Sequence, residues 1–313
     1  MISVQKLEKR YGPTYAVRGI SFEVNRGEIV GFLGPNGAGK TTTMKVLTGF
    51  LVADGGKAEV AGLDVRDRSL EVRRRIGYLP ENAPLYLDMT VLDTLRFMAS
   101  VRRIPRSARK AKIDRAIQRC GLSAVVHKPA GKCSKGYRQR LGLAQALVHE
   151  PEILILDEPT SGLDPNQIVE IRNLIKEIGR EKTVILSTHI LPEVKATCSR
   201  AIIIHEGAIV ANAGLAELES TAAKGNSLTV TFKGAATDME HRLRAIAGVT
   251  HVRRESDAPE ARFQVRGEAG KDLREDIFAL AKASDQVLLE MTRASAGLED
   301  VFRRLTGKGT HAE

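Results

Sequence analysis

The segment from residue 28 to residue 49 constrains the fold most, because a strand-like apolar run, a glycine-rich turn and a helical run follow one another in it. "EIVGF" precedes "LGPNGAGKTT", and "TTMKVLTG" ends the segment. The turn matches the pattern GxxxxGK[ST] in the strand–turn–helix context that a phosphate loop requires. Its glycines let backbone N–H groups surround a phosphate, and the start of the helix favours an anion. We therefore predict a phosphate-binding loop; a glycine-rich turn with a surface lysine is the alternative. The expected nucleotide contacts are Gly34, Pro35, Asn36, Gly37, Ala38, Gly39, Lys40, Thr41 and Thr42.

Two further apolar runs end in polar residues that could complete this site. "ILILDEP" ends at Asp157 and Glu158, and "TVILSTHI" places His189 just past another apolar run. Ligands of open α/β sheets bind at the carboxyl ends of the strands, so these side chains should meet the phosphate loop there. We expect Lys40 to neutralise the β- and γ-phosphates, and Thr41 and Asp157 to hold Mg²⁺. Glu158 can accept a proton from an attacking water, and His189 can hydrogen-bond a γ-phosphate oxygen. A helix-capping Asp, a surface Glu and a structural His are the alternatives.

The apolar patterning divides the chain into two predicted domains. Up to about residue 220, strand-like runs alternate with helical patterns, as parallel α/β folds require. Residues 90–150 carry helical spacing but no comparable strand run, which predicts a helical subdomain inserted into an α/β P-loop NTPase core. Residues 221–313 show the order β-α-β-β-α-β, which predicts a small ferredoxin-like α+β domain. A final helix is expected to bury Leu298, Val301, Phe302 and Leu305.

Composition and charge restrict the class of protein further. No run approaches the roughly 20 apolar residues of a membrane span, and the N-terminus lacks the apolar core of a secretory signal, so we expect a cytosolic protein. Three cysteines without metal-site spacing indicate free thiols. The formal charge is +10. A basic patch favours an acidic partner, whether nucleic acid, anionic lipid or protein, although a solvated helix face explains it equally well. The patch comprises Arg96, Arg102, Arg103, Arg106, Arg109, Lys110, Lys112, Arg115 and Arg119, opposed within the segment only by Asp114.

Four stretches together resemble the ATP-binding subunits of ABC transporters. "GPNGAGKTT", "CSKGYRQR", "LILDEPTSGLD" and "STHI" occur in that family's order within residues 1 to about 220. The resemblance implies that "CSKGYRQR" is the signature loop, usually Leu-Ser-Gly-Gly-Gln, which closes on the γ-phosphate of ATP held by the other subunit. Ser134 and Gly136 keep the positions that would supply a hydroxyl and a backbone N–H. The departures are Cys133, Lys135 and Tyr137; a basic polar turn is the alternative for the stretch.

The resemblance assigns roles to three more residues. Tyr11 looks like the aromatic residue that stacks on adenine, with a strand-edge tyrosine as the alternative. Asp164 resembles the loop that touches the opposite subunit, and it could also cap the helix that follows Pro165. Glu81 stands where the family has a Gln that senses Mg²⁺ and links the site to the membrane subunit. A carboxylate can ligate Mg²⁺ but adds negative charge beside a triphosphate.

The resemblance implies an ATPase that pairs head to tail with a second copy of itself, or with a paralogous subunit, around two MgATP. It also implies a separate transmembrane permease, a position on the inner face of the cell membrane and a basic patch facing anionic lipid headgroups or an acidic loop. "GLEDVFRRLTG", "YLPENAPLY" and "SKGYRQRLGLAQAL" resemble the ABC-2 exporter-like branch and its gliding-motility-associated members, which implies export. The alternative is a soluble ABC-type ATPase acting on nucleic acid. Three features count against this alternative. The sequence has no coiled-coil insertion, no second ATP-binding half and only 4% aromatic residues, so no nucleic acid is expected.

Overall fold

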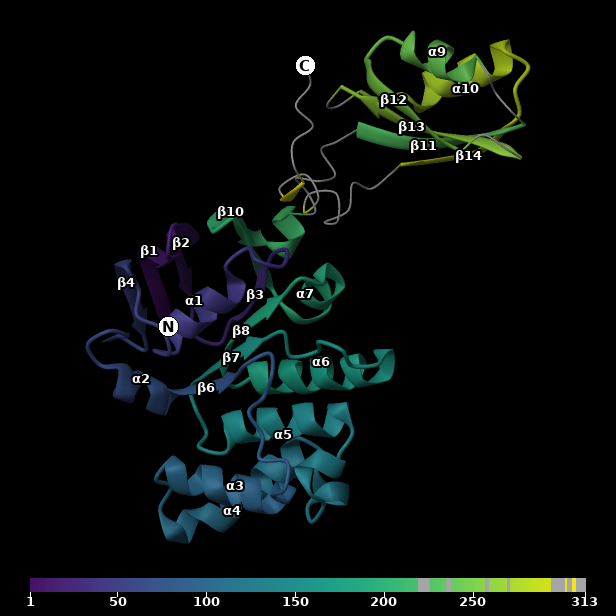
Figure 1. The fold of residues 1–313 in the computed structure, drawn as a ribbon. Helices are drawn as coiled ribbons and strands as arrows, with labels where there is room; N and C mark the ends of the chain where they lie inside the picture. Colours follow the sequence, from purple (N-terminus) through teal and green to yellow (C-terminus); the bar gives the residue numbers. More distant parts are fainter. Residues whose placement is uncertain are drawn as a thin grey trace. The chain divides into compact units, whose positions relative to one another are not determined.

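The computed structural model describes residues 1–218, 226–234, 238–256, 259–268 and 271–293, and the single positions 302, 306 and 307. The chain divides into two compact units, Met1–Leu215 and Ala216–Glu313 (Figure 1). The division falls slightly before the boundary predicted at residue 220, because the last strand of the first unit already ends at Gly214. Among the described residues, no helix is both long enough and apolar enough to cross a bilayer.

A six-stranded sheet forms the centre of the first unit, with the strand order β10-β9-β3-β8-β7-β6. All neighbours in it are parallel except β10, which runs antiparallel to β9 at the edge. The predicted α/β core is confirmed. The strands are β3 (Ile29–Leu33), β6 (Ile76–Leu79), β7 (Ile153–Asp157), β8 (Thr183–Thr188), β9 (Arg200–His205) and β10 (Ala208–Gly214).

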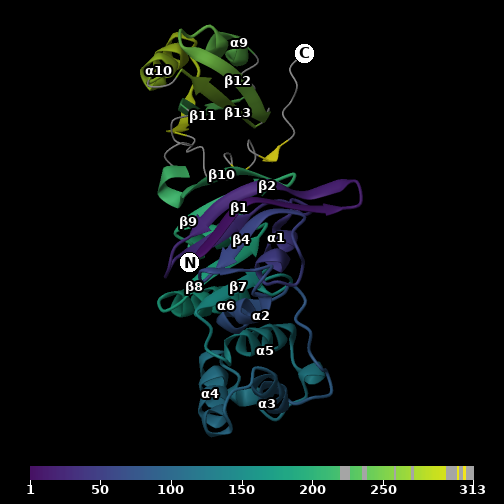
Figure 2. The same ribbon diagram turned by 90° about the vertical axis from the view of Figure 1, so that its left-hand side faces the viewer.

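A four-stranded antiparallel sheet, ordered β2-β1-β4-β5, packs beside this core, and the parallel α/β prediction missed it. Strands β1, β2 and β4 lie side by side in Figure 2. Its alternating burial, apolar toward the core and polar outward, is that of a sheet covered on one face. The strands are β1 (Ile2–Tyr11), β2 (Thr14–Val24), β4 (Gly55–Val60) and β5 (Leu63–Asp64).

Helices cover the six-stranded sheet and form the predicted helical subdomain. Helices α3, α4 and α5 lie together at the end of the unit away from β1 and β2 (Figure 1). The helices are α1 (Lys40–Leu47), α2 (Ser69–Arg75), α3 (Val91–Val101), α4 (Arg106–Arg119), α5 (Lys135–Leu147), α6 (Pro165–Gly179) and α7 (Leu191–Thr197), with 3-10 turns at Ser123–Val125 and Ala130–Lys132.

Strand β7 separates two hydrophobic cores, because its successive side chains point to opposite faces of the sheet. Ile153 and Ile155 join the core that contains α1 and the antiparallel sheet. Leu154 and Leu156 join the core formed with α6 and the helical subdomain. All five residues of β7 are buried, which holds its carboxyl end, Asp157, at a fixed place at the edge of the sheet.

The second unit has the ferredoxin-like order that the sequence predicts. Its antiparallel sheet, ordered β12-β13-β11-β14, is covered by α9 and α10, and Phe232 and Phe263 meet at the centre of its core. The expected final helix falls outside the described residues, apart from position 302. The elements are β11 (Asn226–Lys233), α9 (Met239–Arg244), β12 (Val249–Ser256), β13 (Glu260–Gly267), α10 (Arg274–Ala283) and β14 (Leu288–Arg293).

Candidate functional site

The phosphate loop joins β3 to α1, and its backbone requires glycine at two positions. Gly39 has φ of 106°, and a Cβ built there would lie 2.4 Å from the carbonyl oxygen of Ala16. A Cβ on Gly34 would lie 2.3 Å from the carbonyl oxygen of Ile204. No side chain caps the start of α1, and its first turn carries no acidic residue. The N–H groups there are therefore arranged to bind an anion such as phosphate.

Lys40, Glu158 and His189 form one connected group at the carboxyl edge of the sheet. Lys40 Nζ donates to the carbonyl oxygens of Gly34 (2.8 Å) and Pro35 (3.2 Å) and lies 3.3 Å from Glu158 Oε1. His189 Nδ1 lies 2.9 Å from Glu158 Oε2. Lys40 and Glu158 are buried, whereas the imidazole of His189 is 43% exposed. A buried carboxylate between a cation and an imidazole is suited to orienting water and accepting its proton.

Asp157 has the environment of a magnesium ligand. Thr41 Oγ1 donates to Asp157 Oδ1 (3.2 Å), and the Ser187 hydroxyl donates to the same oxygen. Asp157 Oδ2 is buried and has no hydrogen-bond partner in the described structure, although buried carboxylate oxygens are ordinarily paired. A hydrated Mg²⁺, which takes few protein oxygens besides phosphate and water, fits this oxygen donor set. No cluster of three or more His, Cys, Asp or Glu suited to a metal occurs among the described residues.

The strand register brings these residues together. Leu33 at the end of β3 pairs with Thr188 on β8, and Asp157 on β7 pairs with Ser187. Three strand ends therefore meet at one edge, as the sequence predicts. A pocket of about 390 Å³ opens there. It is lined by Ala16, Asn36, Gly37, Gly39, Lys40, Thr41, Thr42, Glu81, Glu158, Ser161 and His189.

Four predicted nucleotide contacts outside the phosphate loop do not line this pocket, and neither do Gly34, Pro35 and Ala38 within the loop. Ser134 is the N-cap of α5, where its hydroxyl accepts from the Tyr137 N–H (3.4 Å), and Gly136 is buried in the first turn of that helix. Asp164 is the N-cap of α6 and accepts from the Gln167 N–H (2.9 Å), which is its predicted capping role. Tyr11 lies at the end of β1 and is 50% exposed.

A match to a family model covers residues 17–161, and that family is described as ABC transporter. The Nod factor export ATP-binding protein I of Burkholderia pseudomallei is 34% identical to the chain over 318 aligned positions, which cover 98% of the chain and 97% of that protein. This chain belongs to the ABC transporter ATP-binding proteins. It is an ABC ATPase, and it binds ATP.

Two other relatives and one solved structure are similar to this ABC ATPase over about two thirds or more of its length. The uncharacterized ABC transporter ATP-binding protein YxlF of Bacillus subtilis is 39% identical over 70% of the chain and 72% of its own length. The bacitracin transport ATP-binding protein BcrA of Bacillus licheniformis is 40% identical over 67% of the chain and 68% of its own length. CbiO1 of Clostridium perfringens, part of an ABC transporter complex, superposes with a TM-score of 0.65 at 27% identity, covering 79% of this chain and 95% of its own.

The signature stretch of the ABC ATPase departs from the family at Lys135, and the structure places that side chain. The ammonium of Lys135 lies against Gly162 of "SGLD", where a Cβ on Gly162 would be 1.9 Å from Nζ. Gly136 is equally tight, since a Cβ there would lie 2.7 Å from the side chain of Gln167. The signature helix α5 and the start of α6 are therefore in close contact within one subunit.

Sequence reasoning missed several residues around the site. Ala16 and Ser161 line the pocket, and Ser187 holds Asp157. The buried Glu193 accepts hydrogen bonds from Thr160 and Thr188. A signal for Glu193 was present in the sequence, because a carboxylate stands between Pro192 and Val194, five residues after the end of strand β8 at Thr188.

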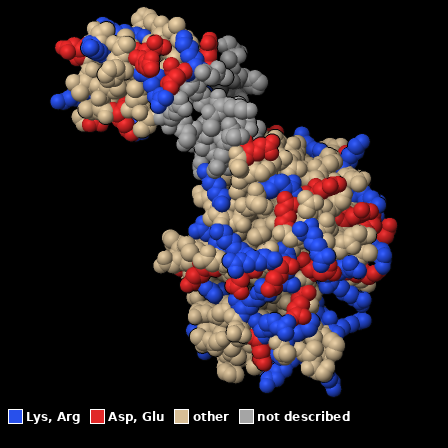
Figure 3. Space-filling model, turned by 180° about the vertical axis from the view of Figure 1, so that it is seen from behind, with Lys and Arg blue, Asp and Glu red and all other residues tan. Residues whose placement is uncertain are grey.

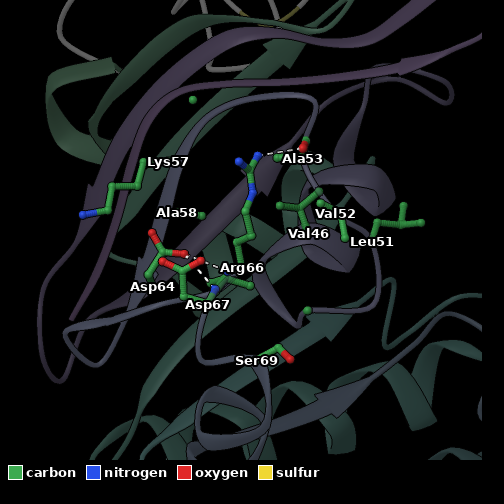
Figure 4. Close-up of a pocket in the computed structure, with 13 residues that line it drawn as sticks. Val46, Leu51, Val52, Ala53, Lys57, Ala58, Asp64, Arg66, Asp67 and Ser69 are labelled. Carbon is green, nitrogen blue, oxygen red and sulfur yellow. Dashed lines mark hydrogen bonds between the residues drawn. The ribbon is translucent and has the colours of Figure 1, made fainter.

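A second hollow, of about 370 Å³, lies at the opposite end of α1 from the phosphate loop (Figure 4). Arg66 extends across it and donates from Nη2 to the carbonyl oxygen of Ala53 (3.0 Å). Asp64 Oδ1 accepts from the N–H groups of Arg66 (2.8 Å) and Asp67 (3.3 Å). None of the predicted site residues lines this hollow, and these polar groups are paired with other groups that line it. We interpret the hollow as structural.

More side chains of the basic patch are paired with acidic residues than the sequence suggests. Glu150 and Glu181, from segments far along the chain, neutralise three of its members, and Arg102 is half-buried and donates to the Arg73 carbonyl oxygen (2.6 Å). On the face shown in Figure 3, Lys and Arg side chains lie among Asp and Glu side chains. The expectation that only Asp114 opposes the patch is therefore wrong. The ion pairs are Arg96–Asp93, Lys112–Glu150, Arg115–Glu150 and Arg119–Glu181.

Proposed function

We propose that this ABC ATPase works as a head-to-tail pair that encloses two MgATP and drives a separate transmembrane permease. One observation carries the proposal. Lys40, Glu158 and His189 line a single pocket, whereas Ser134 and Gly136, which complete an ATP site in the family, do not line it. A second subunit would supply them. Subunit complementation between a Lys40 variant and a Ser134 variant tests the shared site directly.

In the proposed reaction, Glu158 orients a water for in-line attack on the γ-phosphate and accepts its proton, while its hydrogen bond to His189 keeps the carboxylate in place. Lys40 and the loop amides stabilise the charge that develops on the phosphate oxygens. Thr41 and Asp157 would hold Mg²⁺, which would neutralise part of the charge on the phosphates.

Two residues complete the proposed nucleotide site. Glu81 lines the pocket beside Thr41, which supports a role for it at the metal, through a bound water rather than by crowding the triphosphate. Tyr11 offers a half-exposed ring at the edge of the β1–β2 hairpin, and Ala16 of the same hairpin lines the pocket. This position supports adenine stacking on Tyr11.

An apolar groove supports permease docking. It has a volume of about 430 Å³ and combines apolar side chains with the cations Lys45 and Arg102. The ring of Phe50, which lines it, is 73% exposed, and Tyr86 and Phe97 lie edge to face nearby (5.7 Å). The groove is lined by Lys45, Phe50, Tyr78, Leu79, Pro80, Asn82, Ala83, Pro84, Met98, Arg102, Gly142, Gln145 and Ala146. The Glu81 loop thus runs from the nucleotide pocket to the groove.

We predict that Phe50→Asp reduces recovery of the chain with its membrane complex by roughly 30-fold, because an exposed aromatic anchor of an interface contributes about 2 kcal/mol or more. ATP hydrolysis by the isolated chain should change less than about two-fold, since Phe50 does not line the nucleotide pocket. Quantitative immunoblotting of sedimented membranes measures recovery. Val169→Asp on α6, outside the groove, is the matched control. Equal recovery of both variants would contradict docking at this groove.

Export is the proposed direction of transport. The relatives that are 34% and 40% identical carry the names of a Nod factor exporter and a bacitracin transporter. The assignment to the ABC-2 branch, with gliding-motility-associated members, remains a prediction from the resemblance. The basic patch, which would face nucleic acid in the alternative, is interrupted by acidic side chains, and this weakens that alternative.

We propose that Arg103, Arg106 and Lys110, which have no ion pair among the described residues, contact anionic lipid headgroups. We predict that reversing these three charges lowers binding to phosphatidylserine vesicles by about ten-fold, at about 1 kcal/mol for each cation near a charged surface, discounted for screening. Vesicle co-sedimentation at two salt concentrations measures this effect. Reversal of the paired Lys112, Arg115 and Arg119 is the control. If both triple variants bind as the parent does, the patch has no role at lipid.

A further inference from the structure

Glu193 is a carboxylate buried in the protein interior, and the mechanism described above does not use it. It lies in the first turn of α7 and is 2% exposed. Burial of a carboxylate is costly unless its oxygens are paired, and here each oxygen accepts one hydrogen bond. The Thr160 hydroxyl donates to Oε1, and the Thr188 hydroxyl donates to Oε2 (2.8 Å). Both threonines are themselves buried.

The two threonines belong to the two loops that carry the catalytic pair. Thr160 lies two positions after Glu158, at the end of β7, and Thr188 immediately precedes His189, at the end of β8. Thr188 Oγ1 also accepts from the Ile190 N–H (3.0 Å), which closes the backbone turn around His189. Glu193 therefore links both loops through the two threonine hydroxyls. Glu158 and His189 lie on the same two loops, with Oε2 of Glu158 2.9 Å from Nδ1 of His189.

The loop after β7 needs such support. Glu158 has φ of 48°, in the left-handed region that non-glycine residues rarely adopt. Strained conformations of this kind persist where surrounding contacts over-determine them. The backbone N–H of Glu158 donates to the Ser187 carbonyl oxygen (3.0 Å), and Glu193 adds the second tie between the same two loops through Thr160.

Helix α7 gives Glu193 a rigid base. It packs beside β8 and β3 (Figure 1), and a Cβ on Gly31 of β3 would lie only 2.6 Å from Val194 Cγ1. Strand β3 leads directly into the phosphate loop. The helix that carries the carboxylate therefore packs against the strand that leads to Lys40.

We propose that Glu193 is a positioning residue, which sets the distance and orientation between Glu158 and His189 by accepting hydrogen bonds from Thr160 and Thr188. The inference rests on the catalytic roles proposed for Glu158 and His189. Nucleotide binding, which depends on the phosphate loop, should be insensitive to Glu193, and the chemical step should be sensitive to it.

Steady-state hydrolysis by purified variants separates these two effects. Glu193→Ala should lower kcat on the order of 100-fold, because a displacement of about 1 Å at a reacting group costs about that much. The KM for ATP and the dissociation constant of a fluorescent ATP analogue should stay within about three-fold. Glu193→Gln, which can still pair with both hydroxyls, should recover most of the lost rate.

A double-mutant cycle tests the route of action. If Glu193 acts through Thr160, Thr160→Val in the Glu193→Ala background should cost no further activity, because both substitutions remove the same hydrogen bond. Thr197→Val is the matched control, since Thr197 is a buried hydroxyl on α7 without a hydrogen-bond partner in the described structure, and its kcat should be unchanged. Should Glu193→Ala fail to fold, the isosteric Thr160→Val and Thr188→Val variants carry the test.

A lowered melting temperature with an unchanged kcat per folded molecule would show that Glu193 only stabilises the fold, and the inference would be wrong. Additive losses in the cycle would equally overturn it. Failure of the proposed function gives a different result. In that case Glu158→Gln would still hydrolyse ATP, whatever the Glu193 variants do.

Discussion

Glu158→Gln is expected to bind ATP, to hydrolyse it about 10²- to 10⁴-fold more slowly than the parent chain, and to accumulate as a dimer. The amide keeps the shape of the side chain beside Lys40 and His189 but cannot accept a proton from water. It also removes one negative charge from beside the triphosphate, which favours the closed pair. Phosphate release gives the rate, and light scattering after size exclusion with saturating ATP gives the mass.

Glu152→Gln is the matched control for this result. Glu152 precedes the same strand, β7, but is exposed and lies away from the pocket. Its substitution should leave both rate and mass unchanged. If Glu158→Gln stayed monomeric at saturating ATP, the nucleotide would not lie between two subunits, and the proposed pairing would fail even though the loss of hydrolysis remained.

Mixing two inactive variants is expected to restore hydrolysis. Lys40→Ala removes the phosphate-binding ammonium, and Ser134→Asp keeps an N-cap residue on α5 while placing a negative charge where the partner's γ-phosphate would lie. Each variant alone should lose at least about 100-fold in rate. In a head-to-tail pair, one site of each mixed dimer is intact, so an equal mixture should regain about a quarter of the parent rate.

The control mixture combines Lys40→Ala with Glu158→Gln. Both substitutions damage the half-site that a subunit supplies around its own nucleotide, as the 3.3 Å separation of the two side chains shows. Every site of a mixed dimer is then defective, and no activity should return. Recovery in this mixture, or none in the first, would contradict a site shared between α5 of one subunit and the phosphate loop of the other.

The phosphate loop was predictable because its chemistry depends on contiguous backbone. Gly34 and Gly39 are the residues that the close approach to Ile204 and Ala16 requires, and the pattern of nine loop residues records that requirement directly. Asp157 and His189 were predictable for a related reason. Asp157 ends a strongly apolar strand and His189 directly follows another, and the ends of parallel strands meet at one edge of a sheet.

Contacts between segments that are distant in the sequence could not be predicted from it. The basic patch looked unopposed because Glu150 and Glu181 lie outside its segment, and only the packing of α4 against the end of α5 and the loop before β8 brings them to it. The antiparallel sheet was missed because its strands, unlike those of the parallel sheet, are buried on one face only and give a weaker apolar signal.

The sequence alone thus determined the fold class, the phosphate loop and the strand-end residues, because local backbone geometry and apolar runs specify them. Tertiary structure alone decided which groups from distant segments share a hydrogen bond. Thr160 and Glu193 are 33 residues apart, and Ser134 lies outside the pocket that Lys40 lines. Such meetings depend on strand order and register, which no short stretch of sequence encodes.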